Sequence, residues 1–225
     1  MKSVLLAISV IFNLGLVLGQ QWRRDLDADV DVALSRLWDA RASTQEYLDV
    51  MNDIEDLLWT KVQPGVSSIQ ENLPFIKITF ADIENIQIQI NQASSILVYQ
   101  AKLQGKELVK HLRLLNQTET NLSSASYSNL PENQSDLVAQ ANNVNSVQET
   151  ALSLSGDEVV AFNNLLNAIL EGQNGTAVDE IKASMADINN ELYLLGDEIS
   201  LDSYQVGTTT ELLYEALGTI IGQLP

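Results

Sequence analysis

Apolar residues recur at helical spacing along most of the chain. Between residues 25 and 63 they stand three or four positions apart at most steps, which indicates an amphipathic helix. Pro64-Gly65 follows as a typical helix stop. We therefore predict one long helix over about 25–63.

A second apolar series has a period of seven residues. Its members are Ile69, Ile76, Ile83, Ile90 and Leu97. Such a repeat buries a narrow stripe against partner helices, so it predicts another long helix over about 68–115. Pro74 lacks an amide donor, and we expect this helix to begin or bend near it. Ile83 and Ile90, in the middle of the series, are expected to be buried.

Polar residues interrupt the stripe and help to choose between architectures. They stand at Gln87, Ser94, Gln104 and His111, where a two-stranded coiled coil would favour apolar side chains. This imperfection favours a bundle in which each helix has several neighbours.

The rest of the chain divides at a polar segment. Residues 116–133 are rich in Asn and Ser and contain Pro131, which predicts a loop. Helical spacing resumes over about 134–171, 176–203 and 208–222. The strand-like alternation of Ile86, Ile88 and Ile90 lies inside the seven-residue repeat and is outweighed by it. We predict an all-α fold, an elongated antiparallel and coiled-coil-like bundle of about five helices in one domain over 20–225.

The first 19 residues have the layout of a secretory signal peptide. The segment from Val4 to Leu18 is apolar apart from Ser9 and Asn13, follows Lys2 and ends at Gly19. About 15 residues are short for spanning about 30 Å of hydrocarbon. We expect cleavage after Gly19 and a secreted, extracellular protein; the alternative is an uncleaved N-terminal anchor.

Charge narrows the range of partners. The chain has 12 basic and 30 acidic residues, a formal net charge of −18. Such a chain repels phosphate backbones and anionic lipid surfaces, so we expect no nucleic-acid partner. No second apolar run reaches membrane-spanning length, so no membrane span is expected after cleavage.

Cysteine is absent, which excludes disulfides, thiolate nucleophiles and thiolate metal sites. An exported chain of this kind must be held together by apolar burial. Four Asn-x-Ser/Thr sequons agree with export and make the protein a candidate glycoprotein. The candidate N-glycosylation sites are Asn116, Asn121, Asn133 and Asn174.

No residue pattern predicts a catalytic, cofactor-binding or metal-binding site. His111 is the single histidine, and we expect it to be an exposed structural residue near a helix C-terminus. A di-iron bundle needs two Glu-x-x-His pairs and is excluded. Asp25, Asp27, Asp29 and Asp31 lack the Gly and Glu of an EF-hand loop and indicate a solvated helix start. Glycine-rich phosphate motifs are missing.

The tryptophans offer no clear binding motif either. Trp38 and Trp59 are 21 residues apart, or three heptads, and therefore lie on nearly the same stripe. We expect this stripe to be a packing edge.

Three classes of function remain. We favour a non-enzymatic extracellular interaction or structural protein, with an unidentified protein partner or self-association, because the apolar seam is narrow and basic residues are scarce. The alternative is a carrier of lipid or a small apolar ligand, similar to the exchangeable apolipoproteins in architecture alone. A hydrolase with two carboxylates is a remote third, since no pair stands out among 30 acids.

Overall fold

The computed structural model describes the backbone of residues 2–224, and the side chains of residues 25–224 except Leu154 and Ser155. The predicted signal peptide therefore lies outside the residues whose side chains are described. The chain forms α1 (Lys2–Leu57), a π-helical segment η1 (Leu58–Val62), α2 (Gln63–Asn72), a 3₁₀ turn η2 (Leu73–Phe75), α3 (Phe80–Ser123), η3 (Tyr127–Asn129), α4 (Leu130–Leu170) and α5 (Thr176–Gln223). The described residues contain no strand, so the all-α prediction is confirmed.

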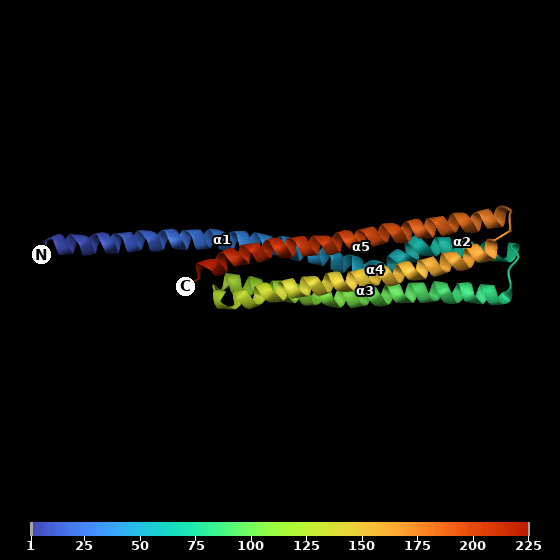
Figure 1. Cartoon of the computed structure of the whole chain (residues 1–225), viewed down its shortest axis with the longest axis horizontal. Coiled ribbons are helices and arrows are strands. Elements are labelled where there is room, and N and C mark those ends of the chain that lie inside the picture. Colours follow the sequence, from blue (N-terminus) through green and yellow to red (C-terminus); the bar gives the residue numbers. More distant parts are fainter. Residues whose placement is uncertain (1, 225) are drawn as a thin grey trace.

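Four long rods run antiparallel along one axis (Figure 1). The first rod is α1, η1 and α2 in succession, and the others are α3, α4 and α5. The first rod packs beside α3 and α5, and α4 also packs between α3 and α5, so the four rods form a ring around a shared core. The bundle has four rods and not about five because α5 continues through residues 203–208 without the predicted break.

The predicted stop at Pro64-Gly65 is wrong. The helical path continues through it to Asn72, because Pro64 stands in the first turn of α2, where a missing N–H disrupts least. The π-helical segment η1 immediately precedes it, and Gln63 N–H donates to the Leu58 carbonyl across five residues. Gly65 then lets α2 approach α5, since a Cβ at that position would lie 2.6 Å from Ile188 Cγ1.

The predicted helix over 68–115 is interrupted, as Pro74 suggested. Thr79 caps α3, since its hydroxyl accepts a hydrogen bond from the Asp82 amide at 3.1 Å and its own amide donates to the Asp82 carboxylate at 3.1 Å. The first rod therefore ends near Phe75 and α3 starts at Phe80. At the other end of the chain, α1 extends before Asp25, so the four aspartates do not mark a helix start.

The predicted loop over 116–133 is also wrong in extent. Only Ser124–Ser126 lie between α3 and the short turn η3, and the flanking polar residues are helical. Hydroxyl side chains within this stretch bond to their own helix: Thr118 donates to the Leu114 carbonyl and Thr120 to the Asn116 carbonyl, both at 2.9 Å. A polar sequence here reflects an exposed helix surface, not a loop.

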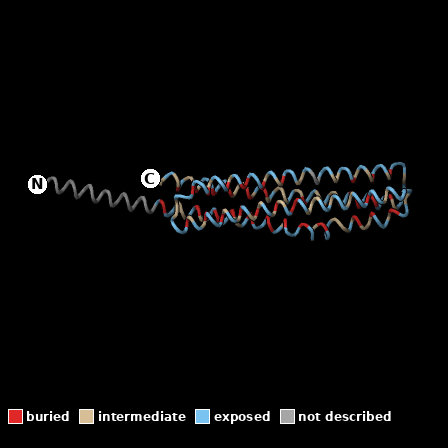
Figure 2. Tube along the Cα trace, turned by 90° about the horizontal axis from the view of Figure 1, so that it is seen from below, coloured by how far each residue is buried: buried red, intermediate tan, exposed pale blue. Residues whose placement is uncertain are grey.

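Buried residues lie on the inner faces of the rods (Figure 2). In α1 they repeat every seven residues, at Leu26, Ala33, Ala40, Tyr47 and Ile54. In the second half of α3 they repeat in the same way, at Ala101, Leu108, Leu115 and Leu122. Burying these stripes against the neighbouring rods supplies the stabilisation that a chain without disulfides needs.

The isoleucines chosen from the sequence are not the most buried ones. Ile83 and Ile90 are only partly buried, whereas Ile86 is fully buried. Within α3 the series continues from Ile90 to Gln104, His111 and Thr118, which are buried, and Ile83 and Ile90 pack against the core as partly buried residues. The prediction that Ile83 and Ile90 are the buried centre of the seam is therefore wrong, because the first half of α3 is less covered than the second.

Candidate functional site

A cavity of about 490 Å³ lies between all four rods, near the middle of the bundle. Most of its surface is apolar, from Met51 and Ile54 of α1, Leu97 and Ala101 of α3, Val159 of α4, and Leu192 and Leu195 of α5. Cavities of this size and lining are typical of sites for small molecules.

Several small residues line the cavity. Ala101 occupies the heptad position that Leu108, Leu115 and Leu122 fill further along α3. Ala151, Gly156 and Gly196 also line the cavity, from the neighbouring helices α4 and α5. Small side chains fill less of the space between helices than leucine would, so these residues contribute to the open volume.

The mouth of the cavity lies between α4 and α5. Its exposed lining residues are Gly156 and Val160 of α4 and Tyr193 and Asp197 of α5. Val160 is 58% exposed and Tyr193 is 67% exposed, so apolar surface continues from the cavity to the outside of the molecule. A ligand could therefore enter without unfolding the bundle.

Most polar side chains around the cavity are satisfied by one another. Asn163 and Asn189 exchange two hydrogen bonds, at 3.0 and 3.3 Å, and Gln148 Nε2 donates to Ser200 Oγ at 3.2 Å. These pairs join α4 to α5 on either side of the mouth. They fix the edges of the cavity and leave little polar capacity for a ligand.

Two residues of the lining also carry a buried polar atom without a well-aligned hydrogen bond. Tyr47 is fully buried, and its hydroxyl forms no well-aligned hydrogen bond, although Gln104 and Ser203 lie close to it. Gln104 is 1% exposed; its Nε2 donates to the Val144 carbonyl at 3.0 Å, but its Oε1 accepts nothing. Unsatisfied buried polar atoms are rare in native proteins.

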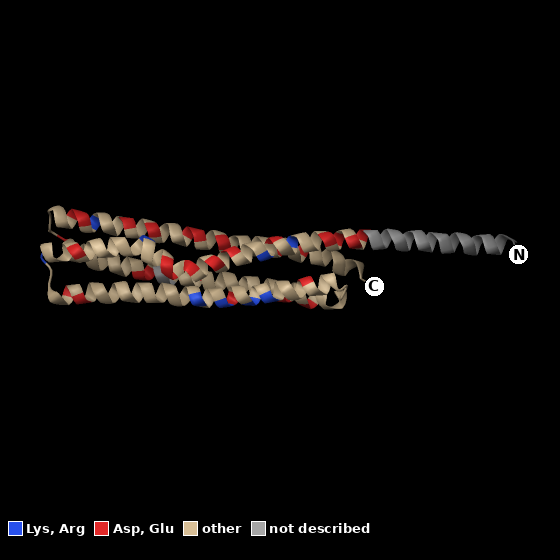
Figure 3. Ribbon diagram, turned by 180° about the vertical axis from the view of Figure 1, so that it is seen from behind, with Lys and Arg blue, Asp and Glu red and all other residues tan. Residues whose placement is uncertain are grey.

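The surroundings of the cavity are negatively charged. Between Leu130 and Gln223 the only basic residue is Lys182, whereas acidic residues recur along both α4 and α5 (Figure 3). Burial, followed by repulsion from Glu198 and Glu46, raises the pKa of Asp202. Burial and the nearby Asp202 raise the pKa of Tyr47, so its phenol stays neutral at physiological pH.

The basic residues gather elsewhere. Lys102, Lys106, Lys110 and Arg113 follow one another along α3, beside a groove shared with α1. None of the described residues that line the cavity is Lys, Arg or His. An anionic ligand would therefore find no counter-charge in the cavity.

His111 is not exposed, contrary to the prediction. Its ring is fully buried between α3 and α5, and its Nε2 lies 3.0 Å from Thr210 Oγ1. Burial lowers its pKa to about 4, and its Nδ1 has no partner. It lies outside the cavity lining and serves as a polar layer of the core.

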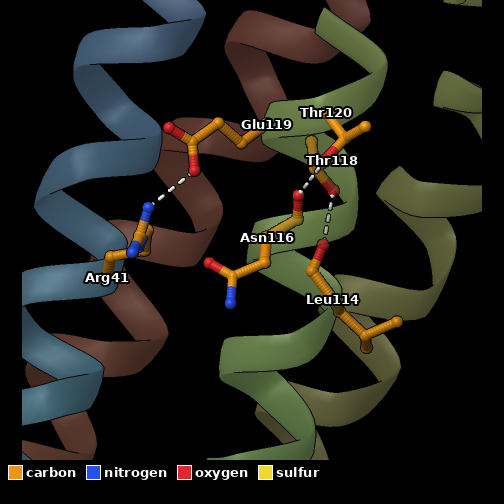
Figure 4. A network of polar contacts seen from close by, with 6 residues as sticks. All are labelled: Arg41, Leu114, Asn116, Thr118, Glu119 and Thr120. Atoms are coloured by element: carbon orange, nitrogen blue, oxygen red, sulfur yellow. Dashed lines mark hydrogen bonds and ion pairs between the residues drawn. The ribbon is translucent and has the colours of Figure 1, made fainter.

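The sequons differ in their access to solvent. The asparagines of two of them, Asn116 and Asn174, are exposed. Asn133 is only 2% exposed, and its Oδ1 accepts a hydrogen bond from Asn121 Nδ2 at 2.6 Å. Asn116 extends from α3 near the Arg41–Glu119 ion pair, 2.6 Å long, which links α1 to α3 (Figure 4). The folded bundle thus presents two of the four candidate sites.

The tryptophans are also more exposed than expected. Trp38 is 62% exposed and Trp59 is 70% exposed, so they do not form a packing edge. The Arg41 guanidinium lies 5.9 Å from the centre of the Trp38 ring. Trp59 instead lines an outer groove that also contains Tyr99 of α3.

The cavity could not be found from periodicity alone. Gln104 was visible as a polar residue at a seam position, and Ala101 stands three residues before it. The missing signal was that small residues of three helices line the same cavity, which depends on how the helices are aligned. In the described residues, no three metal-binding side chains gather. The described helices also contain no apolar stretch long enough to cross a bilayer.

No protein family model matches this chain, and no curated protein or solved structure shows significant similarity to it.

Proposed function

We propose that the protein binds a small, mostly apolar molecule in the cavity between its helices and acts as its carrier. The observation that supports this most is a 490 Å³ cavity with apolar walls and an exposed mouth between the four rods. This was the second of the functions considered from the sequence, and the cavity now favours it over a purely structural role.

A filling substitution tests this proposal. Ala101→Leu restores the leucine that occupies the same heptad position in the next three layers, so it should fold well and occupy part of the cavity. Filling a cavity typically stabilises by about 0.5–2 kcal/mol. We expect wild-type protein to enhance the fluorescence of the neutral probe N-phenyl-1-naphthylamine, and Ala101→Leu to lose most of this binding.

Ala42→Leu is the matched control, because Ala42 is exposed on α1 and lies outside the cavity. It should bind the probe like wild type. If wild type and both variants bind the probe equally, or if none binds it, the carrier function is wrong.

We also propose that the carrier is exported, after cleavage at Gly19. The apolar leader and the exposed sequons at Asn116 and Asn174 support this. Mass spectrometry of protein from a eukaryotic secreting host should find a chain that begins at Gln20, with glycans on Asn116 or Asn174 and none on the buried Asn133. A secreted chain that retains Met1 would contradict this proposal.

A second candidate function is docking of another macromolecule on the outer groove between the first rod and α3. This groove is lined by Trp59 and Tyr99, and the Tyr99 side chain is 60% exposed. Exposed aromatic residues are enriched at protein interfaces. Chemical crosslinking would be carried out in the native fluid with the wild-type protein and with a Trp59→Ser/Tyr99→Ser double variant. The double variant should lose the crosslinks to a partner that the wild type makes, while its thermal stability stays unchanged. Identical crosslinks in both proteins would argue against this candidate.

A further inference from the structure

We infer that a second copy of this chain docks on the groove between α1 and α3 through the outer face of its α5. The groove has a basic rim, and the outer face of α5 is apolar and acidic. This inference goes beyond the carrier function and does not depend on it. It rests on the second candidate function, docking on the α1–α3 side, and names the partner.

The groove between α1 and α3 has an apolar floor and a basic rim. Its volume is about 750 Å³, and Leu48, Val98 and Leu103 belong to its apolar lining. Its rim on α3 holds four exposed basic side chains, at Lys102, Lys106, Lys110 and Arg113. Spacings of three or four residues place them on one face of the helix, over about 17 Å. Glu55 is the one acidic residue among the described lining residues.

Most of this basic stripe has no counter-charge. Lys110 pairs with Glu107 of its own helix at 2.7 Å. Within the part of the chain whose side chains are described, Lys102, Lys106 and Arg113 form no ion pair. The four residues are a third of the 12 basic residues in a chain of net charge −18. Such a local concentration of positive charge on an acidic protein favours an acidic partner.

The outer face of α5 has the complementary chemistry. Among the described residues, α5 holds six of the 14 large apolar side chains that are exposed. Four of these six share one outer face, at Leu194, Leu201, Tyr204 and Leu212. Exposed carboxylates lie along the same face, at Asp197, Glu198, Glu211 and Glu215. Contiguous exposed apolar surface with a polar rim is typical of an interaction site.

The acidic stripe is long enough to cover the basic one. From Leu194 to Glu215 it extends for about 32 Å, and α5 has no basic residue after Lys182. Figure 3 shows this contrast, with Lys and Arg gathered on α3 and mainly Asp and Glu on α5. Repulsion between two acidic chains is screened beyond about 8–10 Å in physiological salt, so the local contacts decide whether they associate.

The two surfaces cannot meet within one molecule. α3 and α5 each pack against the first rod and against α4, so they lie at opposite corners of the ring of rods. The outer face of α5 therefore points away from the α1–α3 groove of its own chain. Since every chain offers both surfaces, one copy can bind the next. A contact between two different surfaces does not close on two copies, so it produces rows of rods.

Two double variants remove one surface each. Lys102→Glu/Lys106→Glu, the groove variant, reverses the basic rim, and Leu201→Ser/Tyr204→Ser, the stripe variant, removes apolar side chains of α5. All four positions are exposed, so both variants should melt like wild type. In sedimentation velocity of the secreted protein, we expect the mass of wild type to rise with concentration beyond that of two chains. Each variant alone should stay monomeric at the same concentrations.

Mixing the two variants tests whether the surfaces bind each other. An equimolar mixture should form a dimer and nothing larger, because only one intact groove and one intact stripe can pair. Arg36→Glu/Lys182→Glu is the matched control, since it makes the same change in net charge at exposed positions outside both surfaces. This control should associate like wild type.

The results separate this inference from the functions proposed above. A monomeric wild type, a monomeric mixture, or a control that dissociates like the groove variant would overturn docking of a second copy. If a monomeric wild type instead formed crosslinks in the native fluid that the groove variant loses, the groove would belong to a different protein and the second candidate function would stand. Leu201 and Tyr204 lie outside the cavity lining, so the stripe variant should bind N-phenyl-1-naphthylamine like wild type whichever result is found.

Discussion

At the scale of single residues, the bundle buries several polar side chains that a simple apolar seam would exclude. Gln104 and His111 were recognised in the sequence as polar residues on the seam, and both are buried. Their partners could not be recognised, because Val144 and Thr210 belong to other helices whose alignment no local pattern gives. The role of each polar residue therefore becomes visible only in the assembled bundle.

His111 should make stability depend on pH. Its folded-state pKa is about 4, below the value of about 6.5 expected in the unfolded chain, so the unfolded state binds protons first as the pH falls. The corresponding stabilisation is complete above pH 6.5 and is lost towards pH 4, by about 3 kcal/mol.

The comparison uses His111→Leu, which cannot titrate and leaves Thr210 bonded to the Val206 carbonyl at 2.7 Å. Urea unfolding at pH 7 and pH 4 should show wild type losing about 3 kcal/mol relative to the variant. Parallel pH dependence in the two proteins would show that His111 is not buried as a neutral ring.

At the scale of helices, the sequence predicted the type of structure better than its boundaries. Apolar spacing gave the helices, because an inner face must recur with the period of the helix. The predicted helix stop at Pro64 and the predicted loop over 116–133 were both wrong. Proline in a first helical turn is compatible with helix, and so are polar residues on a helix surface. The caps and the π-helical segment that decide these cases are three-dimensional features.

The register of α3 gives a direct test of the corrected seam. Ile86→Ala should lower the free energy of unfolding by about 2–5 kcal/mol, since Ile86 is fully buried. Ile83→Ala is the matched control three residues earlier, and it should cost clearly less because Ile83 is only partly buried. Equal losses in urea unfolding, or a larger loss for Ile83→Ala, would restore the original seven-residue seam.

The close approach of α2 and α5 predicts a different response to alanine at two glycines. Gly65→Ala should destabilise by about 1–3 kcal/mol, because the new Cβ would lie 2.6 Å from the buried Ile188 and 3.3 Å from the Ser184 carbonyl. Gly156→Ala meets no atom within 4 Å and should stabilise α4 by up to about 1 kcal/mol. Thermal melts that shift in the same direction for both would contradict this packing.

At the scale of the whole molecule, four antiparallel rods enclose a cavity whose walls are apolar and whose mouth lies on the acidic α4–α5 side. The fold class follows from the sequence, but the cavity does not. Its lining includes Ala101, Ala151, Gly156 and Gly196, which are up to 95 positions apart in the chain. Apolar periodicity shows where large side chains recur along one helix. It does not show where small residues of different helices leave a cavity between them.

The stoichiometry of ligand binding is the most direct test of whether the cavity is the functional site. Native mass spectrometry of the wild-type protein incubated with N-phenyl-1-naphthylamine should show one bound probe molecule per chain, and Ala101→Leu, with the cavity partly filled, should show none under the same conditions. A wild-type protein that binds no probe, or a variant that binds it with the same stoichiometry and stability, would contradict the assignment of this cavity as the functional site.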